Sequence, residues 1–500
     1  MTAKVRGING PAVTIESGEF SMSEMIDVGG LMGEIIALMP NTATAQLYEN
    51  TAGLRPGTAV TGTGQPLSVN LQPGIVGHIF DGIFRPLDAA ARNVWPTRVL
   101  ATVGQHLSEG DIYAEVDETL LITYKAMVPP GISGTVTSAA QDGEYDPAHP
   151  IITLDNTVLT LSQTWPIRIP RPVKIRQPLS RPLITGQRVI DTFFPIAKGG
   201  TAAIPGGFGT GKTMIQHQLA KWCDADLIVY IGCGERGNEM TEVLEDFAKL
   251  TDPKNGQPLL NRTVLIANTS DMPVAAREAS IYTGITIAEC YRDMGYHVAV
   301  MADSTSRWAE ALRELSGRLG EIPAEEGYPA YLATRLSAFY GRAGYVTNLN
   351  GTDGSVTIVG AVSPQGGDFS EPVTTHTKRF ISCYWALDRR LAYARHFPAI
   401  DWMNSYSNYL PVLSDHAKKI SPKLMGLREK AMSILMDEHA LLEIVKLIGS
   451  DALSKNQRET LALAKKIRQE FLQQNAYDPQ DTFMPPEKQF ALLDNIITNL

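Results

Sequence analysis

The chain has 500 residues and a formal net charge of −9, and 44% of its residues are hydrophobic while 19% are charged. This composition excludes an intrinsically disordered chain, and the length suffices for roughly two to four domains. The acidic balance argues against a protein that follows nucleic acid, because such proteins need basic groups to replace the counterions of the phosphates. The most basic stretch, residues 168–181, contains three prolines and is interpreted as a solvated linker rather than a polyanion site.

The cysteines and the apolar segments indicate the compartment. Cys223, Cys233, Cys290 and Cys383 form no Cys-x-x-Cys pair, so a structural zinc site is not expected. We expect these cysteines to be reduced and mostly buried, as in a cytosolic protein. The first residues lack the apolar core of a signal peptide, and no run approaches the ~18 apolar residues of a membrane span. A role at a membrane would therefore require other subunits to hold the chain there.

The first 175 residues are predicted to be rich in β-structure. Residues 1–68 contain short alternating strands separated by Gly, Pro and Asn turns, which predicts a small β-barrel. Residues 69–99 are interpreted as a connection to the core. Residues 100–175 again have a strand-like pattern with many prolines and glycines, and we expect a separate β-rich insert there.

The next part of the chain has an α/β pattern. Within residues 176–390, apolar runs at 226–231, 263–267 and 297–302 alternate with longer helical patterns. That alternation predicts a largely parallel sheet flanked by helices.

Residues 391–500 are predicted to form a helical domain. Apolar residues spaced three or four apart between positions 461 and 471 share one helical face. Ser454 and Gln457 have the spacing of a capping box and predict the start of that helix.

The strongest local motif is a phosphate loop at residues 206–213, which fits the pattern G-x-x-x-x-G-K-[ST]. Its glycines let the backbone curl so that N–H groups point at phosphate oxygens, and a helix predicted from about residue 212 to 221 adds the positive end of its dipole. The lysine is expected to reach the β- and γ-phosphates, and the following threonine hydroxyl to ligate Mg²⁺. A glycine-rich turn before a helix is the alternative. The predicted nucleotide-binding residues of the loop are Gly206, Gly207, Phe208, Gly209, Thr210, Gly211, Lys212 and Thr213.

Two acidic residues follow predicted strands. Asp303 ends the apolar run 297–302, where a carboxylate can hold the water shell of Mg²⁺; a helix N-cap is the alternative, and one residue can do both. Glu235 lies in the glycine-rich segment 232–239 and is expected to orient the water that attacks the γ-phosphate. Arg236 beside it would contact the γ-phosphate or hold Glu235 in place. A solvated loop with an incidental ion pair is the alternative for these two residues.

Five longer segments extend the pattern beyond the phosphate loop, and they are residues 182–191, 234–239, 302–313, 320–329 and 363–372. The first leads into the loop as it does in rotary ATPases generally. The other four resemble the catalytic subunit of the V/A-type rotary ATPases in particular. The similarity covers nearly the whole chain, to about residue 493, and these motifs are far more specific than the phosphate loop.

The resemblance implies a multidomain fold with an N-terminal β-barrel, a β-rich insert, a central RecA-like α/β P-loop core and a C-terminal helical domain. It implies ATP or ADP with Mg²⁺ as ligands. It also implies that the loop lysine and threonine bind phosphate and Mg²⁺, that Glu235 orients the water and that Arg236 contacts phosphate. Phe397 and Tyr477 match the two aromatic residues on the adenine side of the family's site. Simple core packing is the alternative for both.

The resemblance also implies partners. Three catalytic and three noncatalytic subunits would alternate in a ring, with the noncatalytic neighbour supplying an arginine finger, because no segment of this chain clearly offers one. A central rotor stalk, a peripheral stator stalk and a membrane sector that moves H⁺ or Na⁺ complete the expected machine. The turn at residues 449–454 matches the place where ring subunits touch the rotor, with an ordinary surface turn as the alternative.

The chain departs from the family pattern in two places. After residues 82–87, part of the stretch that precedes the insert is missing, so the insert looks shortened, and the C-terminus ends early. Both departures leave the contacts with stator and neighbouring subunits open.

Three other functions compete with this interpretation. A noncatalytic ring subunit would tend to lose the loop lysine or the catalytic glutamate, and this chain keeps Lys212 and Glu235. A transcription-terminating RNA translocase would need a basic RNA-binding domain. A secretion or flagellar export ATPase would lack the insert at residues 100–175.

Overall fold

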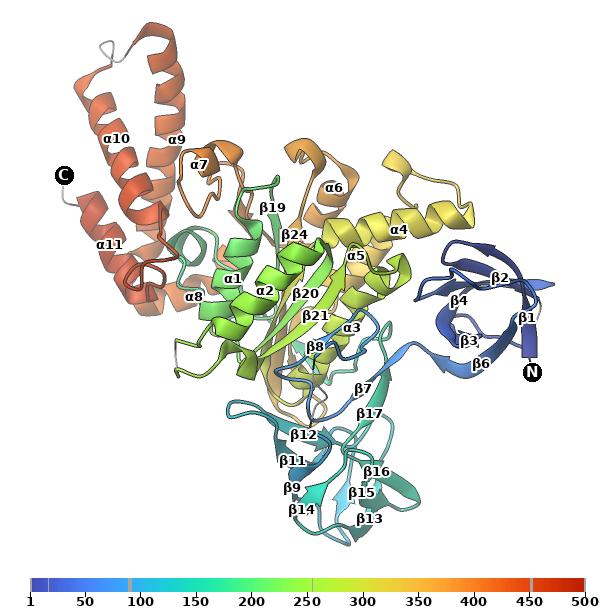
Figure 1. Ribbon diagram of the computed structural model, residues 1–500. Coiled ribbons are helices and arrows are strands. Elements are labelled where there is room, and N and C mark those ends of the chain that lie inside the picture. The colour runs from blue at the N-terminus through green and yellow to red at the C-terminus, as the bar shows by residue number, and fades with distance from the viewer. Residues whose placement is uncertain (1, 17, 89–91, 254, 450–452, 499–500) are drawn as a thin grey trace. The chain divides into compact units, whose positions relative to one another are not determined.

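The computed structural model describes residues 2–16, 18–88, 92–253, 255–449 and 453–498 (Figure 1). By their contacts the residues divide into two compact units, each assembled from separate stretches of the chain. Unit 1 draws on residues 1–177, 225–362 and 370–380, and unit 2 draws on residues 178–224, 363–369 and 381–500.

Unit 1 begins with a closed six-stranded β-barrel, drawn in dark blue in Figure 1, which confirms the predicted barrel. Along its second strand Val13 and Ile15 are fully buried, whereas Thr14 and Glu16 are partly or fully exposed. Such alternation places one face of each strand in the barrel core. In barrel order the strands are β1 (Thr2–Asn9), β2 (Ala12–Glu16), β5 (Thr42–Leu47), β4 (Leu31–Met39), β3 (Glu24–Val28) and β6 (Ala59–Pro66).

The predicted β-rich insert is also present in unit 1. The antiparallel pair of β7 (Ser68–Leu71) and β17 (Gln163–Pro166) joins the chain where it enters and leaves this region. One four-stranded sheet has the order β10 (His106–Leu107), β13 (Gly134–Ala139), β15 (Pro150–Leu154) and β16 (Thr157–Thr160). The other has the order β12 (Thr123–Met127), β11 (Ile112–Asp117), β9 (Trp95–Val99) and β14 (Gly143–Tyr145).

The core of unit 1 is the predicted parallel sheet. Residues 227–234 of β20 are all buried, as expected for a strand covered by helices on both faces. β20 runs parallel to β22, and Gly232 lies opposite Asp303, so both strands end at the same edge of the sheet. The parallel strands in order are β24 (Asp353–Val362), β22 (His297–Asp303), β20 (Leu227–Glu235), β21 (Thr263–Thr269) and β8 (Ile79–Phe80), and β18 (Ile175–Gln177) and β23 (Gly344–Thr347) extend the sheet antiparallel. The α-helices described in this unit are α2 (Gly237–Lys249), α3 (Val274–Asp293), α4 (Thr305–Leu319), α5 (Leu332–Tyr340) and α6 (Pro372–Lys378).

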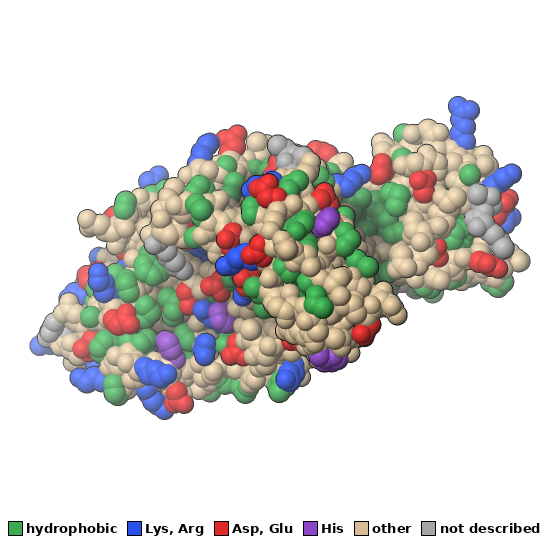
Figure 2. All heavy atoms as spheres, turned by 90° about the horizontal axis from the view of Figure 1, so that it is seen from below, with side chains coloured by type: hydrophobic (Ala, Val, Ile, Leu, Met, Phe, Trp, Pro, Cys, Tyr) green, Lys and Arg blue, Asp and Glu red, His purple; other side chains and the backbone are tan. Residues whose placement is uncertain are grey.

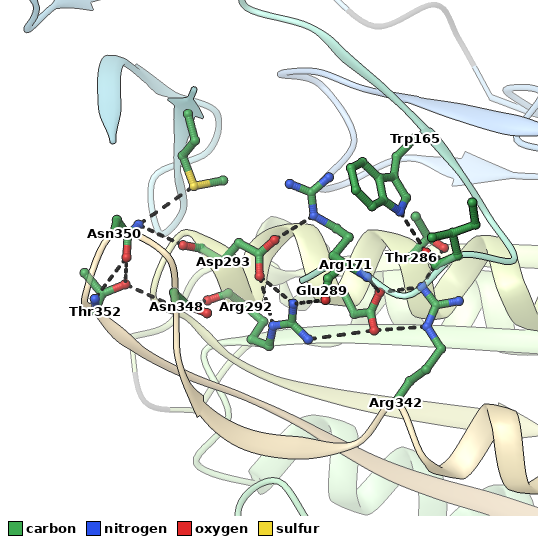
Figure 3. Close-up of polar contacts among 12 residues, drawn as sticks. Trp165, Arg171, Thr286, Glu289, Arg292, Asp293, Arg342, Asn348, Asn350 and Thr352 are labelled. Carbon is green, nitrogen blue, oxygen red and sulfur yellow. Dashed lines mark hydrogen bonds and ion pairs between the residues drawn. The ribbon is translucent and has the colours of Figure 1, made fainter. Parts of the chain in front are cut away.

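A buried ionic cluster at the end of α3 binds the segment around Arg171, where the chain leaves the insert (Figure 3). Glu289 accepts hydrogen bonds from Arg342 Nε at 3.0 Å and from the main-chain N–H of Arg171 at 2.9 Å. Asp293 accepts from Arg171 Nε and from Arg292 Nη2, both at 2.6 Å. Buried charges are tolerated when they are paired and hydrogen-bonded in this way, so the cluster holds the insert's exit segment against the core.

Unit 2 contains a smaller β-structure and the phosphate loop. β19 (Thr201–Pro205) pairs in parallel with β25 (Cys383–Tyr384), which pairs antiparallel with β26 (Tyr406–Ser407). The helix after the loop is α1 (Lys212–Trp222), close to the predicted span. The other α- and π-helices described in unit 2 are the π-helix Val189–Phe193, α7 (Arg389–Tyr393), α8 (Leu410–Ile420), α9 (Leu424–Ile448), α10 (Lys455–Lys466), the π-helix Ile467–Leu472 and α11 (Pro486–Thr498).

The C-terminal part of unit 2 confirms the predicted helical domain. Ser454 and Gln457 form the predicted capping box, with Gln457 N donating to Ser454 Oγ at 3.3 Å and Ser454 N donating to Gln457 Oε1 at 2.8 Å. Ile467 and Phe471 of the predicted apolar face are buried. Residues 450–452 of the expected rotor-facing turn lie outside the described residues.

The surface charges and the apolar character of the helices can be compared with what nucleic-acid binding and membrane insertion require. On the face drawn in Figure 2, Lys and Arg side chains are interspersed with Asp and Glu side chains. Within the described ranges, no helix combines the length and the apolar character that crossing a bilayer requires.

Candidate nucleotide-binding site

The phosphate loop joins a fully buried strand to an exposed helix start. All residues of β19 are buried, which anchors the loop at one end. Gly209 and Gly211 have φ values of 76° and 91°, a region that favours glycine, and Gly211 is the N-cap of α1. Thr210 is buried, and its hydroxyl donates to the carbonyl oxygen of Gly207 at 2.8 Å. The loop therefore curls tightly in front of the positive end of α1, which is the geometry that binds anions.

The loop lysine is held across the loop. Lys212 Nζ donates to the carbonyl oxygens of Gly206 and Gly207 at 2.8 Å and 3.0 Å. Thr213 is exposed beside it on the first turn of α1. The Phe208 side chain is 81% exposed, so this residue can serve a ligand of the loop mainly through its backbone.

A cavity of about 570 Å³ lies beside the loop within unit 2. Phe397 and Tyr477 both line it, with exposed fractions of 43% and 80%. Neither ring is therefore enclosed in a core, which was the alternative considered for them. A Cβ on Gly211 would lie 3.7 Å from the Phe397 ring, so this ring lies close to the phosphate loop. The volume is in the range of small-molecule sites. The other lining residues are Gln187, Ile190, Gly209, Thr210, Met214, Ile215, Gln218, Arg395, Pro398, Ala399, Gln473, Gln474, Asn475 and Ala476.

A buried arginine that the sequence did not single out holds one wall of this cavity. Arg188 is 3% exposed, its Nε donates to the carbonyl oxygen of Phe471 at 2.7 Å, and its guanidinium also binds Asp481 and the carbonyl oxygen of Gln473. Its main-chain N–H donates to Gln474 Oε1 at 2.8 Å. The segment that carries Tyr477 is thereby tied to Arg188, which precedes β19 and the phosphate loop in the chain.

The turn before Arg188 is equally constrained. Asp191 accepts hydrogen bonds from the N–H groups of Thr185 and Gly186 at 2.9 Å and 2.8 Å, and from Gln489 Nε2 at 3.0 Å. Burial raises the pKa of Asp191 to about 6, although these hydrogen bonds oppose the shift. Gly186 has a φ of 72°, and a Cβ there would come within 1.9 Å of the Phe483 ring. A glycine is therefore required at this position.

The predicted acidic residues lie together in unit 1, at the carboxyl edge of the parallel sheet. Asp303 is 3% exposed and accepts a hydrogen bond from Tyr230 Oη at 3.1 Å. The pKa of Glu235 is raised to about 8, first by burial, then by the negative charge of Asp303 and a hydrogen bond with Glu239, while Arg307 opposes the shift. Like charges at close range disfavour ionisation. This edge would therefore be stabilised by a bound cation.

Glycine and arginine residues shape the surroundings of Glu235. Gly234 has a φ of 74°, and a Cβ there would lie 2.8 Å from Arg307 and 2.9 Å from Arg277. Arg236 is exposed at the N-cap position of α2. The sequence analysis gave Arg277, Arg307 and Glu239 no role, although Glu239 lies in the segment 234–239 and Arg307 in the segment 302–313, both of which carried the family resemblance.

The predicted site residues thus form two groups. Unit 2 brings together the phosphate loop, Phe397 and Tyr477 around one cavity, and unit 1 brings together Glu235, Arg236 and Asp303. In the described part of the chain, no group of three or more His, Cys, Asp or Glu side chains is arranged to hold a metal by itself.

Comparison with protein families matches four consecutive regions. Residues 5–64 match the beta-barrel domain of the ATP synthase alpha/beta family, and residues 85–168 match the barrel-sandwich domain of ATP synthase alpha/beta subunits. Residues 186–407 match the nucleotide-binding domain of the ATP synthase alpha/beta family. Residues 414–500 match the C-terminal domain of V and A type ATP synthase.

Comparison with whole proteins decides the family. The chain is 57% identical to the V-type ATP synthase alpha chain 2 of Clostridium tetani, with 99% of this chain and 88% of that protein covered. The chain belongs to the family of V-type and A-type ATP synthase alpha (A) chains. Another member, the A chain of the A-type ATP synthase of Methanopyrus kandleri, is 54% identical over 99% of this chain and 90% of its own length.

Membership of the V/A-type family confirms the resemblance stated from the sequence, and the four matched regions confirm the predicted fold class. A solved structure, that of the assembled ATPase EscN from the enteropathogenic E. coli type III secretion system, superposes with a TM-score of 0.73 and covers 99% of this chain and 100% of that chain. Its sequence identity is 21%, so the likeness concerns the fold alone. The two V/A-type members share more than half of their aligned residues with this chain.

Proposed function

We propose that this chain is the catalytic subunit of a V/A-type rotary ATPase, which hydrolyses or synthesises ATP with Mg²⁺. The proposal is carried by one observation in unit 2. A phosphate loop with Lys212 held across it borders a cavity of about 570 Å³ whose walls present two accessible aromatic rings. A nucleotide needs both features, because its phosphates are anionic and its base stacks on aromatic faces.

The phosphate loop and the cavity would bind different parts of the nucleotide. Lys212 and the N–H groups of residues 206–213 would bind the phosphates, and Phe397 and Tyr477 would contact the adenine. Thr213 and Asp303 would hold Mg²⁺, since oxygen ligands suit this ion and one or two protein ligands suffice beside phosphate and water. Mg²⁺, when bound, offsets the negative charge of the β- and γ-phosphates.

Glu235 and Arg236 are the residues proposed to act on the γ-phosphate. Glu235 would accept a hydrogen bond from the attacking water and orient it in line with the phosphorus, which requires the ionised carboxylate. Its pKa of about 8 in the chain alone means that a nearby positive charge is needed to keep it ionised at neutral pH. Arg236, Mg²⁺ and an arginine from a neighbouring subunit would each supply such a charge.

The proposed setting is a multisubunit machine. Noncatalytic ring subunits alternate with copies of this chain in a hexamer and supply the arginine finger, a central rotor stalk turns within the ring, and a peripheral stator stalk holds it. The chain itself is cytoplasmic and peripheral to a membrane, where a separate sector moves H⁺ or Na⁺. The names of the relatives support this setting, since they are chains of V-type and A-type ATP synthases.

The deciding experiment compares the wild-type chain with Glu235→Gln, each expressed with its genomic ring partner. Glu242→Gln serves as the matched control, because Glu242 is an exposed acid on α2, seven residues further along the chain. We expect Glu235→Gln to bind Mg-ATP normally while turnover falls by orders of magnitude, and Glu242→Gln to behave as the wild type.

The opposite outcome is equally informative. Equally low turnover in the wild type and in Glu235→Gln, with tight nucleotide binding in both, would show that this chain holds nucleotide structurally. The chemistry would then belong to its neighbour in the ring.

A further inference from the structure

The parallel pairing of β19 and β25 brings a second cation to the phosphate loop. Trp385 N donates to the carbonyl oxygen of Ala203 at 2.9 Å, and two residues further along each segment Leu387 N donates to the carbonyl oxygen of Pro205 at 2.8 Å. Two residues beyond these, where α7 begins, Arg389 lies beside Gly207. The register of a buried strand pair therefore determines where the Arg389 side chain lies.

Two glycines make room for this side chain. A Cβ on Gly207 would lie 2.6 Å from Arg389 Nε and 2.7 Å from its Nη2, which is closer than a real Cβ can approach. Gly367, with a φ of 81°, is also close, since a Cβ there would be 3.9 Å from Arg389 Cζ. The guanidinium thus packs directly against the phosphate-loop backbone, and any other residue at position 207 would push it away.

Arg389 has no acceptor of its own, in contrast to its neighbour. Among the residues that the structure describes, its guanidinium donates no hydrogen bond and forms no ion pair. The Arg389 residue is exposed and therefore accessible to a ligand. The Gly207 carbonyl beside it already accepts from Thr210 and Lys212. Arg390, by contrast, pairs with Asp388 at 3.0 Å.

The position along the loop indicates which part of a ligand Arg389 would meet. Residues 209–211 line the cavity that holds Phe397, so the base belongs at that end of the loop. Gly206 and Gly207 form the other end, where Lys212 Nζ lies. The lysine of a phosphate loop reaches the β- and γ-phosphates, so Arg389 stands at the terminal-phosphate end.

We propose that Arg389 binds the terminal phosphate of a nucleoside triphosphate and so favours the triphosphate over the diphosphate in this chain. The inference rests on the proposed function, because it assumes that a nucleotide occupies the loop. A guanidinium suits this task, since its planar fork donates two parallel hydrogen bonds to phosphate oxygens. Arg389 comes from the same chain and unit as the loop, and it is therefore distinct from the arginine expected from a neighbouring subunit.

The test is a binding titration of the full chain with Mg²⁺ and either AMP-PNP, a non-hydrolysable triphosphate analogue, or ADP. For Arg389→Ala we expect the affinity for AMP-PNP to fall about 10- to 100-fold, because a charge-assisted hydrogen bond to phosphate is lost. The affinity for ADP should stay within about twofold of that of the wild type. Arg390→Ala is the matched control and should leave both affinities unchanged, because its guanidinium is occupied by Asp388. Unchanged AMP-PNP affinity in Arg389→Ala, or an equal loss for AMP-PNP and ADP, overturns the proposal.

A second variant tests the same contact without removing the arginine. Gly207→Ala places a Cβ against Arg389 Nε and should displace the guanidinium. We expect its preference for AMP-PNP over ADP to fall like that of Arg389→Ala, and the double variant to show no further loss of that preference, since both changes break one contact. Additive losses in preference contradict the proposal.

Two reference measurements separate this inference from the function on which it rests. The wild type must bind both nucleotides, and Lys212→Ala must lose both. Absence of nucleotide binding by the wild type would reject the proposed function itself. Binding by the wild type and its loss in Lys212→Ala, together with wild-type behaviour of Arg389→Ala, would reject the role of Arg389 alone.

Discussion

Lys212 donates to two carbonyl oxygens of its own loop, so its charge is already positioned where phosphates would bind. We expect Lys212→Ala to lower the affinity for nucleotide at least tenfold and to abolish turnover, because the charge of the β- and γ-phosphates is no longer offset. Isothermal titration with Mg-ADP measures the first effect, and phosphate release in the presence of the ring partner measures the second. Lys249→Ala is the control, since Lys249 forms an exposed pair with Glu245 on α2. Unchanged turnover in Lys212→Ala would remove the phosphate-loop assignment.

Glu235 gives the chain a specific dependence of stability on pH. Its pKa rises from 4.5 to about 8 on folding, through burial and then the charge of Asp303, so between these values the folded state holds a proton that the unfolded state has lost. This contribution to stability is complete below about pH 4.5 and is lost as the pH rises towards 8, with a slope of up to about 1.4 kcal/mol per pH unit. The thermal midpoint of Glu235→Gln should therefore fall less steeply than that of the wild type across this window.

Asp303→Asn provides the control for that measurement. Removal of the Asp303 charge should lower the pKa of Glu235 and shift the upper end of the window to lower pH. The same variant should need more Mg²⁺ for turnover in the assembled ring, as expected of a metal ligand. Parallel pH profiles for the wild type and Glu235→Gln would show that Glu235 does not carry the shift, and an unchanged Mg²⁺ titration would leave Asp303 without a metal role.

At the scale of elements, the segment that carries Tyr477 depends on Arg188. The guanidinium and main-chain N–H of Arg188 bind four groups between residues 471 and 481. Replacement by Met keeps the apolar stem and the main-chain donor but removes the guanidinium donors. The buried carbonyl of Phe471 and the part-buried acceptors on Gln473 and Asp481 then lose their partner, at a cost of roughly 1–3 kcal/mol in stability. We also expect roughly tenfold weaker ADP binding, since loss of one base–aromatic contact costs about 1–3 kcal/mol.

Hydrogen exchange locates the effect of Arg188→Met. Residues 473–481 should exchange faster in the variant, whereas β19, beyond this network, should keep its protection. Arg390→Ala is a control for loss of an arginine, because the Arg390 side chain is 90% exposed. Protection of residues 473–481 equal to that of the wild type would mean that other contacts hold this wall of the cavity.

The elements of the site differ in how far the sequence could predict them. The strands that end in Glu235 and Asp303 were predictable, since an apolar run followed by an acid in an α/β pattern is a local signal. Phe397 and Tyr477 came only from the family resemblance, because an aromatic residue in a helical or loop segment fits core packing equally well. Arg188 carries no local signal at all: its partners lie more than 280 residues away and are known only from the folded chain.

At the scale of the whole molecule, the sequence predicts an order of segments but not their packing. The division at residues 68, 99, 175 and 390 stays a prediction. The two compact units are each assembled from stretches that are separate in the sequence. Residues 363–369 belong to the unit that contains the phosphate loop, although the flanking stretches belong to the other unit. Composition cannot reveal this, because a short glycine-rich turn such as Gln365–Gly367 has no hydrophobic pattern that indicates which core it joins. Gly367 beside Arg389 is a consequence of that arrangement.

ATP turnover by this chain should depend on its assembly with the ring partner. The catalytic groups proposed in this chain lack an arginine that a neighbouring noncatalytic subunit would supply, and such a residue contributes roughly 10³–10⁵ in rate. The purified chain at low concentration should therefore bind nucleotide and yet turn over ATP slowly, and addition of the ring partner should raise turnover by a factor of that order. A ring assembled with Lys212→Ala should stay inactive, which would assign the gain to sites on this chain rather than to its partner. Rapid turnover by the monomeric chain would show that every catalytic group is already present, and Arg236, Arg277, Arg307 and Arg389 would then be the arginines to replace first.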